Sequence, residues 1–153
     1  MKAQKKTKLP KPKSLKKICD KNCLQLEKIL DRWFSYFIRL RNADEFGMVG
    51  CITCNKRIYW KDADCGHYVK RGKSACRFHE QNCGEQCKHC NRQRNGEEQA
   101  HRIYIDKVYG EGTAGFLRLK GKKPFEMTKE EYIEKINHYK MTVKQLKIIK
   151  GEK

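Results

Sequence analysis

The chain has 153 residues, with 36 Lys and Arg against 18 Asp and Glu and a formal charge of +18. This excess indicates a polyanionic partner, and nucleic acid is the first choice. A membrane surface is a poor alternative, because no basic amphipathic helix carries the charge and no apolar run approaches transmembrane length. We find no secretory signal, so we expect a cytoplasmic protein with no membrane partner.

Nine cysteines in a chain of this length indicate a metal site rather than disulfides. Cytosolic proteins keep their thiols reduced, and an odd number argues against a complete disulfide framework. A compact part of roughly 100 residues buries a modest core and often needs such a staple.

The predicted elements begin after a basic tail, residues 1–22, which we expect to be flexible. Positions 2–17 hold eight lysines and no acid, and two prolines interrupt any helix. The tail is either a solubilising segment or an arm that contacts phosphates without reading sequence.

Residues 24–41 have the periodicity of an amphipathic helix. The stripe is wide and aromatic, which predicts packing in the core, with a dimer seam as the alternative. Its apolar positions recur at three- and four-residue steps: Leu26, Ile29, Leu30, Trp33, Phe34, Phe37 and Leu40.

Residues 50–96 are rich in cysteine and punctuated by glycine, and 58–60 and 67–69 are the best strand candidates. A second helix is expected to follow. Asn95 with a glutamate three residues later predicts a capping box, and Gly110 predicts the end of that helix.

We expect a loop at 111–127 and helical structure beyond it. Thr128 with Glu131 predicts another capping box. The helix that it opens could restart at Thr142, where a similar pattern occurs.

Two Cys-x-x-Cys pairs are the strongest motifs in the chain: Cys51 with Cys54, and Cys87 with Cys90. The two thiolates of one pair can bind the same tetrahedral ion, and the second pair completes its four ligands. Such a zinc site is structural because no coordination position stays open. The alternative is that some are merely buried thiols. We expect the other five to be small apolar residues or free thiols: Cys19, Cys23, Cys65, Cys76 and Cys83.

A candidate hydrolytic site lies between and beside these pairs. We assign His67 as the general base, because a neutral histidine can take a proton from water near pH 7. Asp64 and Asn91 are assigned as ligands of Mg²⁺ or Mn²⁺, which prefer hard oxygen donors and stabilise charge on a phosphate. Asn82 is assigned as the residue that orients His67.

Each of these four residues also has a plainer explanation, as a packed histidine, a turn asparagine or part of the scaffold. Only their ordered combination between two zinc pairs favours chemistry. Three other histidines are rivals: His79 is near the site and could touch phosphate, His89 is expected to point outward from its knuckle, and His101 is expected to face solvent.

Basic side chains bracket the same residues. We expect them to contact phosphates rather than form a merely solvated surface, which predicts little base specificity and a steep loss of binding with salt. The set is Lys70, Arg71, Lys73, Arg77, Arg92 and Arg94.

Residues 30–110 resemble the phage lambda NinG (Rap) recombination endonucleases. The zinc pairs and the final Cys-Asn are also similar to phage recombination endonuclease VII, a junction resolvase with a ββα-metal site. The ordered motifs are Phe37-Ile-Arg-Leu-Arg41, Cys51-x-x-Cys54, Asp64-x-Gly66-His67-Tyr68, Arg77-Phe78, Asn82, Gln86-Cys87-x-x-Cys90-Asn91 and Asn95-Gly96.

The resemblance implies an α+β fold with a zinc-stapled ββα-metal (HNH/His-Me finger) core and flanking helices. The core would cover 23–112 and a C-terminal helical extension 113–153. It further implies a phage-encoded, metal-dependent endodeoxyribonuclease that cuts Holliday junctions, D-loops and similar branches, as a homodimer because resolution needs two cuts. Gly66 departs from the pattern, since many HNH enzymes carry a metal-binding acid or His there.

Two other functions remain open. One is a non-catalytic zinc module that binds DNA or RNA, with His67 and the asparagines as scaffold. The other is a phage regulatory protein that acts on a host factor, for which only charge and small size speak. The ordered site residues favour the nuclease.

Overall fold

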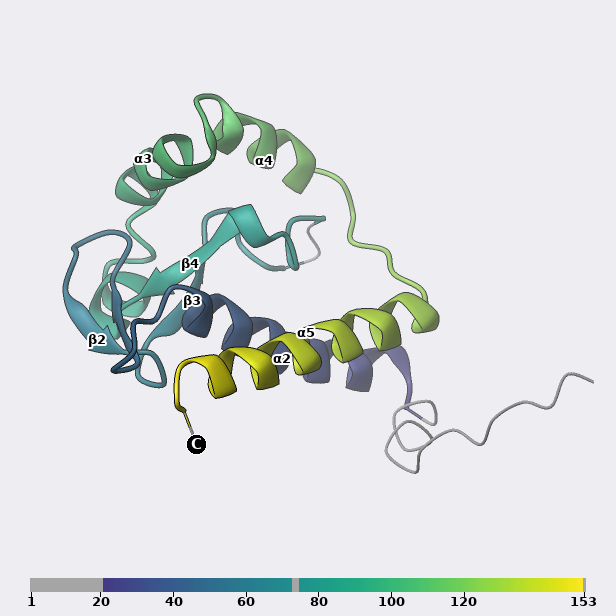
Figure 1. Cartoon of the computed structure of the whole chain (residues 1–153). Helices are drawn as coiled ribbons and strands as arrows, with labels where there is room; N and C mark the ends of the chain where they lie inside the picture. The colour runs from purple at the N-terminus through teal and green to yellow at the C-terminus, as the bar shows by residue number, and fades with distance from the viewer. Residues whose placement is uncertain (1–20, 73–74, 153) are drawn as a thin grey trace, which may run out of the picture.

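The computed structural model describes residues 21–72 and 75–152, and it confirms an α+β fold. The predicted tail up to residue 20 lies outside the described residues, as do Cys19 and Lys73. Three layers lie on one another in Figure 1: a pair of long helices, a central β hairpin, and two shorter helices on the other side.

The first long helix, α2 (Cys23–Arg41), agrees with the predicted amphipathic helix. Asn22 caps it, because its side chain accepts the Gln25 N–H at 2.9 Å while the Gln25 side chain accepts the Asn22 N–H. These reciprocal bonds satisfy two N–H groups that a helix start otherwise leaves unpaired.

The second long helix is α5 (Lys129–Ile149), which packs along α2 (Figure 1). Thr128 and Glu131 form the predicted capping box. The predicted restart at Thr142 is wrong: the helix is continuous there, and the Thr142 hydroxyl donates to the His138 carbonyl one turn earlier. A threonine inside a helix bonds in this way without ending it.

The main core lies between α2, α5 and the hairpin, so the apolar stripe of α2 is core rather than an exposed seam. Phe34 packs edge-on against Phe78 and Tyr139, with ring centroids 5.6 and 5.2 Å apart. The predicted C-terminal extension thus contains a helix that shares the core of α2. The buried members are Leu26, Leu30, Phe34, Ile38, Phe78, Cys83, Tyr132, Ile136 and Tyr139.

Two antiparallel hairpins carry the cysteine-rich region. Strand β1 (Met48–Gly50) pairs with β2 (Arg57–Tyr59), and β3 (Asp64–His67) pairs with β4 (Cys83–Gln86). Strand β2 matches the strand predicted at 58–60 to within one residue.

The strand predicted at 67–69 is shifted to 64–67. The Asn82 side chain accepts the Val69 N–H at 2.8 Å and donates to the Val69 carbonyl at 2.9 Å. A side chain therefore takes the backbone groups that a strand partner would use, and the ladder stops at His67.

Helix α3 (Glu98–Tyr109) ends at Gly110 as predicted, but its predicted capping box is wrong. Asn95 and Glu97 both have left-handed backbone, with φ of 55° and 50°, and no side chain caps the helix. Asn95 instead accepts a bond from the Lys70 amine at 2.9 Å.

The loop predicted at 111–127 is also wrong, because α4 (Thr113–Gly121) occupies half of it. Ala114 and Leu117 are buried against Tyr68, Cys76 and Ile105 in a second small core. With two buried positions in a glycine-flanked segment, the helical period is too short to detect from sequence.

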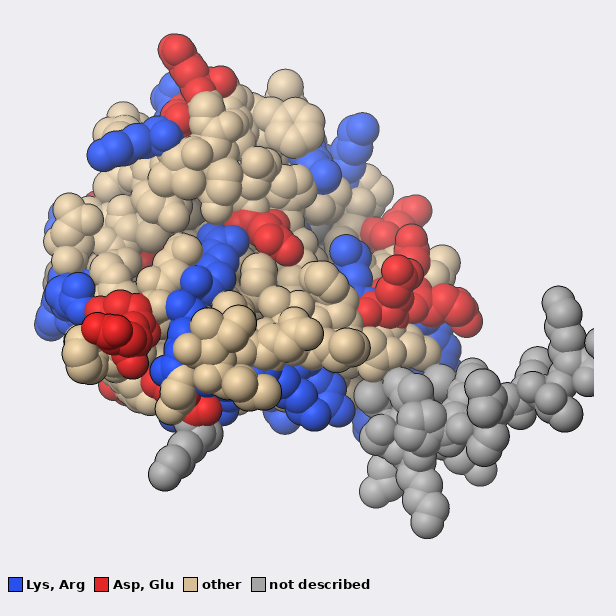
Figure 2. Space-filling model, in the orientation of Figure 1, with Lys and Arg blue, Asp and Glu red and all other residues tan. Residues whose placement is uncertain are grey.

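Charged side chains are unevenly spread over the surface. Figure 2 shows acidic side chains gathered where α5 begins, and Lys and Arg form a band over the middle of the same face. Of the helices in residues 21–72 and 75–152, none is long and apolar enough to cross a membrane.

Candidate functional site

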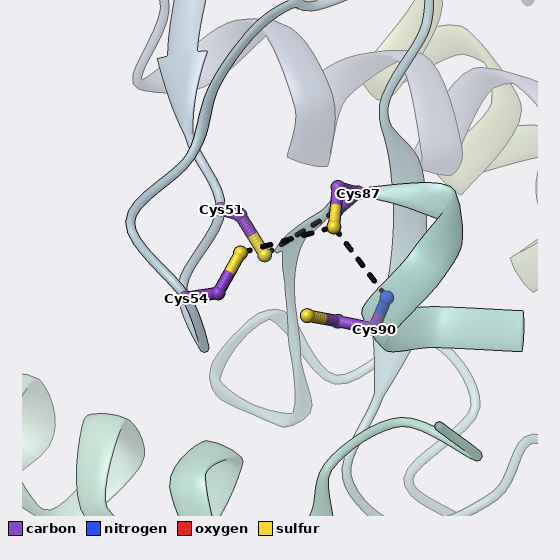
Figure 3. Close-up of side chains that lie close together, drawn as sticks. All are labelled: Cys51, Cys54, Cys87 and Cys90. Carbon is purple, nitrogen blue, oxygen red and sulfur yellow. Dashed lines mark hydrogen bonds between the residues drawn. The ribbon is translucent and has the colours of Figure 1, made fainter. Parts of the chain in front are cut away.

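The two cysteine pairs meet in one cluster (Figure 3). Cys51 and Cys54 lie in the turn between β1 and β2, and Cys87 and Cys90 follow β4. The four sulfur atoms lie within 4.8 Å of one another, and those of Cys54 and Cys87 are 3.9 Å apart. Zinc–sulfur bonds of about 2.3 Å in a tetrahedron place sulfurs about 3.8 Å apart, so the cluster fits a structural zinc ion.

Hydrogen bonds to sulfur favour the thiolate form of one cysteine of this cluster, Cys51. Burial acts to raise the pKa of Cys51, but bonds from the Thr53 hydroxyl and from backbone N–H groups, including that of Cys87, lower it to about 6. Burial raises the pKa of Cys90 to about 12. A bound divalent ion would stabilise all four thiolates and release the remaining protons.

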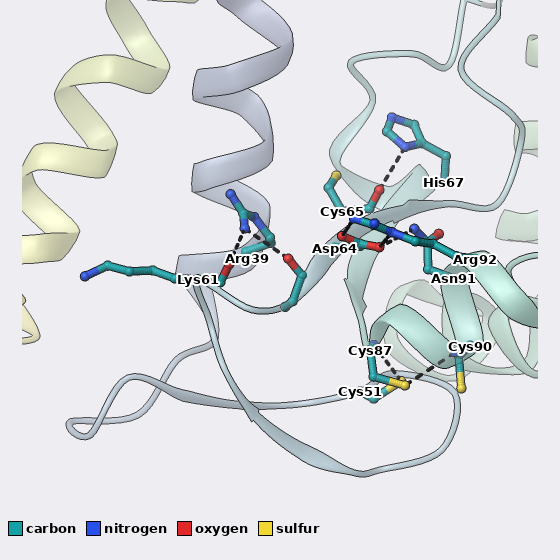
Figure 4. A network of polar contacts seen from close by, with 11 residues as sticks. Arg39, Cys51, Lys61, Asp64, Cys65, His67, Cys87, Cys90, Asn91 and Arg92 are labelled. Atoms are coloured by element: carbon teal, nitrogen blue, oxygen red, sulfur yellow. Dashed lines mark hydrogen bonds and ion pairs between the residues drawn. The ribbon is translucent and has the colours of Figure 1, made fainter.

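Asp64, at the start of β3, lies beside Asn91 as the metal-ligand assignment requires (Figure 4). The Asn91 amide donates to Asp64 Oδ2 at 3.0 Å. Arg92 holds both carboxylate oxygens through bonds of 2.7 and 2.8 Å. Burial acts to raise the pKa of Asp64, but the bonds from Arg92 and Asn91 lower it, so the group carries its charge.

His67, at the end of β3, lies between two backbone carbonyl groups. Its Nδ1 is 3.2 Å from the Cys65 oxygen and its Nε2 is 3.1 Å from the Arg77 oxygen. Burial lowers the pKa of His67, although both carbonyl groups act to raise it. The imidazole is therefore neutral at pH 7, and only one nitrogen can donate.

Asn82 is fully buried and does not contact the His67 ring through any hydrogen bond that the structure shows. Its amide binds Val69 and also donates to the Cys76 carbonyl at 3.1 Å. Asn82 was predicted to orient the His67 ring directly, whereas its side chain binds backbone groups. These belong to Val69 and Cys76, at the two ends of the segment that follows His67. The carbonyl of Arg77, next to Cys76, then meets the imidazole.

Gly66 departs from the HNH pattern for a steric reason. A Cβ atom at this position would overlap the side chain of Gln86, which lies on the same face of the hairpin. Gln86 is fully buried, and its Oε1 has no hydrogen-bond partner within the described residues. The Gln86 side chain therefore occupies the space that a side chain at position 66 would need.

Three hollows that share lining residues form one polar groove, which we call the site groove. Asp64, Arg71 and Asn91 line a hollow of about 430 Å³. His67, Arg71 and Asn91 line the next, of about 220 Å³, and His67 also lines a third of about 210 Å³. The structure thus brings the predicted base and a predicted metal ligand together.

The predicted phosphate contacts have different fates. Lys70, Arg71, Arg92 and Arg94 line the site groove and are exposed, although Arg94 also pairs with Glu97. Arg77 departs from the prediction. Its side chain is 15% exposed, and it binds Asp31 and Glu27 of α2, so it braces the fold instead of facing DNA.

His101 was wrongly expected to face solvent. It is 1% exposed, lines the third hollow beside His67, and its Nε2 has no partner among the described residues. Burial lowers its pKa to about 4, helped by His67. It lies four residues before the buried Ile105, and this single helical spacing was too weak a signal to reveal its burial. His89 is exposed as expected, and His79 is half-buried.

Cys65 and Cys83, which were expected to be small apolar residues or free thiols, are free thiols that lie close to His67. Their sulfur atoms and a ring nitrogen of His67 lie within 4.8 Å of one another. Cys65 and His67 share one face of β3, and Cys83 lies opposite His67 on β4. The alternation of strand side chains could have indicated this grouping, but only once the strand register was known. Cys23 is exposed, as a free thiol can be.

Comparison with known families now decides the relationship that these motifs suggested. The sequence model of the family described as Bacteriophage Lambda NinG protein matches residues 1–149. The chain belongs to the NinG family. This membership confirms the NinG resemblance and supports the expected phage origin. No curated protein and no solved structure matches the chain.

Proposed function

We propose that this NinG-family chain is a phage-encoded, metal-dependent endonuclease that cuts branched DNA in the cytoplasm of the bacterial host, acting as a homodimer. Strands β3 and β4 with the helical turn η2 (His89–Gln93) would form its HNH-type ββα-metal core. The observation that carries the proposal is that His67 and Asn91 line the same hollow.

The surroundings of His67 suit a general base. With Nε2–H donating to the Arg77 carbonyl, the ring is oriented and Nδ1 keeps its lone pair. Water then replaces the Cys65 carbonyl at Nδ1 and gives its proton to Nδ1 as its oxygen attacks phosphorus. The bond from phosphorus to the leaving oxygen of the DNA strand breaks in the same step, and that oxygen takes a proton from solvent. The protonated Nδ1–H can next donate to the Cys65 carbonyl, which stabilises the product of proton transfer.

The donor set also fits a hard divalent cation. Asp64 already neutralises a positive group, the Arg92 guanidinium, and the side chain of Asn91 lies against the same carboxylate. Asp64 and Asn91 would hold Mg²⁺ or Mn²⁺ once Arg92 turns to a phosphate. Such an ion supplies charge stabilisation at the scissile phosphate and the leaving oxygen.

The test compares a labelled four-way junction with a matched linear duplex, using the zinc-loaded chain with Mg²⁺ or with no added Mg²⁺ or Mn²⁺. We expect the wild-type chain to cut the junction only with metal, and His67→Ala to bind it with unchanged affinity but cut at least 100-fold more slowly. His89→Ala, at an exposed histidine of the adjacent turn, is the matched control and should cut normally. Equal cutting by His67→Ala would remove the general base and the proposal with it.

A second candidate is a zinc-dependent nucleic-acid-binding protein without catalysis. One observation favours it: Arg92 already satisfies Asp64, and both ring nitrogens of His67 already face carbonyl groups. It predicts tight binding of the junction and no cutting with any divalent metal. Cutting that is lost in His67→Ala and kept in His89→Ala would exclude it.

A further inference from the structure

A further hollow lies outside the site groove and is larger than each of the three that form the groove. It has a volume of about 600 Å³, which is in the range of pockets that hold small ligands. Trp33 and Tyr36 of α2 and Trp60, just after β2, form its aromatic walls. These include both tryptophans of the chain. We call it the aromatic-basic pocket.

The aromatic rings of the pocket are buried to different extents. Trp60 is 2% exposed and forms the floor, whereas Trp33 and Tyr36 are half-buried and meet edge to face with centroids 5.8 Å apart. Tyr36 also meets Trp60 edge to face, at 6.1 Å. Trp33 and Tyr36 therefore stay partly exposed where they line the hollow, and a flat guest can stack on an aromatic ring in such a place.

None of the described residues that line the pocket is acidic. Four of them are cations that surround the rings: Arg39, Lys61, Lys144 and Lys147. The Arg39 guanidinium lies 5.2 Å from the Tyr36 ring, and Lys61 and Lys147 lie 5.4 and 5.8 Å from that of Trp60. Glu152 beside the pocket pairs with Lys61 at 3.3 Å and leaves a clear positive excess. The pocket therefore suits a flat, anionic guest and repels a cationic one.

The pocket is one helical turn from the site groove. Arg39 donates to the Ser35 carbonyl at 3.1 Å, and Ser35 lines the groove. The Arg39 guanidinium also donates to the carbonyl groups of Lys61 and Ala63, just before Asp64. Figure 4 accordingly shows Arg39 between Lys61 and Asp64. A strand whose phosphate lies in the groove can thus reach the pocket with a neighbouring nucleotide.

We propose that the aromatic-basic pocket binds an unpaired nucleobase of a DNA strand, with Trp33 and Tyr36 stacking on the base and the lysines contacting the flanking phosphates. Stacking platforms combined with cations are how proteins hold single strands without reading sequence. A base inside a duplex is unavailable, so the pocket would favour branched DNA over linear duplex. The proposal rests on the proposed function for its choice of DNA and for its link to the cleavage site.

The test measures binding of a twelve-nucleotide oligo(dT) in buffer without Mg²⁺ or Mn²⁺, so that cutting cannot interfere and the chain keeps its zinc. Binding should quench the tryptophan emission of the zinc-loaded chain, since both tryptophans line the pocket. Trp33→Leu should weaken oligo(dT) binding about tenfold, measured by anisotropy of labelled DNA. Its affinity for a twelve-base-pair duplex should change less than twofold.

Lys144→Glu tests the pocket without touching the core, because Lys144 is exposed. It should also weaken oligo(dT) binding about tenfold. Lys107→Glu on α3 makes the same change of net charge at an exposed position outside the pocket and should cost less than twofold.

Three outcomes would overturn the pocket assignment: unchanged emission at saturating oligo(dT), equal effects of the two lysine variants, or equal losses of oligo(dT) and duplex binding in Trp33→Leu. Emission that falls with protein concentration in the absence of DNA would instead assign the pocket to a second copy of the chain. A chain that cuts junctions while its pocket variants keep their oligo(dT) affinity contradicts this inference alone. A chain that binds oligo(dT) as expected but never cuts contradicts the nuclease alone.

Discussion

At the scale of single residues, buried polar groups decide how the site is built. Asn82 uses three hydrogen bonds to hold backbone on both sides of the segment after His67. That segment supplies the Arg77 carbonyl to the imidazole. The orientation of the proposed base therefore depends on the Asn82 side chain, which forms its hydrogen bonds to backbone and not to the imidazole.

His101 makes the stability of the chain depend on pH. Burial and His67 lower its folded-state pKa to about 4, below the unfolded value of 6.5. The unfolded chain therefore binds more protons between these values, and stability falls as the pH drops through this window. From pH 7 to pH 5 the loss from this group should be about 2 kcal/mol, measured by urea unfolding.

The comparison protein is His101→Gln, in which that part of the acid loss should disappear while any effect of the zinc cysteines is shared. His138→Gln, at an exposed position on α5, should keep the wild-type pH dependence. Parallel pH profiles for wild type and His101→Gln would show that the buried imidazole does not contribute.

At the scale of elements, the α2–α5 pair packs against the β3–β4 hairpin and supports it. The two helices start from complete capping boxes and bury their apolar faces against each other and against β3 and β4. Since α2 also presents Ser35 to the site groove and Trp33 to the aromatic-basic pocket, its packing sets the distance between these two sites.

We expect Ile136→Ala to lower the free energy of unfolding by about 3 kcal/mol, because it opens a cavity at a fully buried position of α5. Met141→Ala, on the same helix but 62% exposed, should change it by less than about 0.5 kcal/mol. Chemical denaturation followed by circular dichroism provides the measurement. Similar values for the two variants would mean that α5 is an appendage and not part of the core.

At the scale of the whole molecule, the cysteine cluster joins the two hairpins. It links the β1–β2 turn to the residues after β4, and η2 with Asn91 follows directly. Loss of the ion would release the turn that carries Asn91 from the hairpin that carries Asp64 and His67.

We expect one tightly held zinc ion per chain, measured by metal analysis, and loss of cooperative thermal unfolding when a strong chelator removes it. A structural zinc site contributes on the order of 10 kcal/mol, comparable to the whole stability of a small domain. Cys87→Ser should lose both the ion and the transition, whereas Cys23→Ser, at an exposed thiol, should keep both. Full thermal stability of the metal-free chain would contradict a structural role.

Features encoded in short stretches of sequence could be predicted. Spacing within each Cys-x-x-Cys pair is local, and so are the capping box at Thr128 and the stripe of α2. The proximity of His67 to Asn91 followed from the order of the motifs, because Asn91 comes directly after a cysteine of the four-cysteine cluster. Such features can be predicted because they depend on a few residues that are close together in the sequence.

Other features depend on which distant surfaces meet, and only the tertiary structure decided them. Arg77 pairs with two acids of α2 that lie 46 and 50 positions earlier in the chain, and His101 is buried because α3 folds over the segment after His67. Trp33 and Trp60 form one pocket although they belong to different elements. Burial and pairing of this kind are properties of packed faces, and periodicity along one segment does not report which face lies opposite.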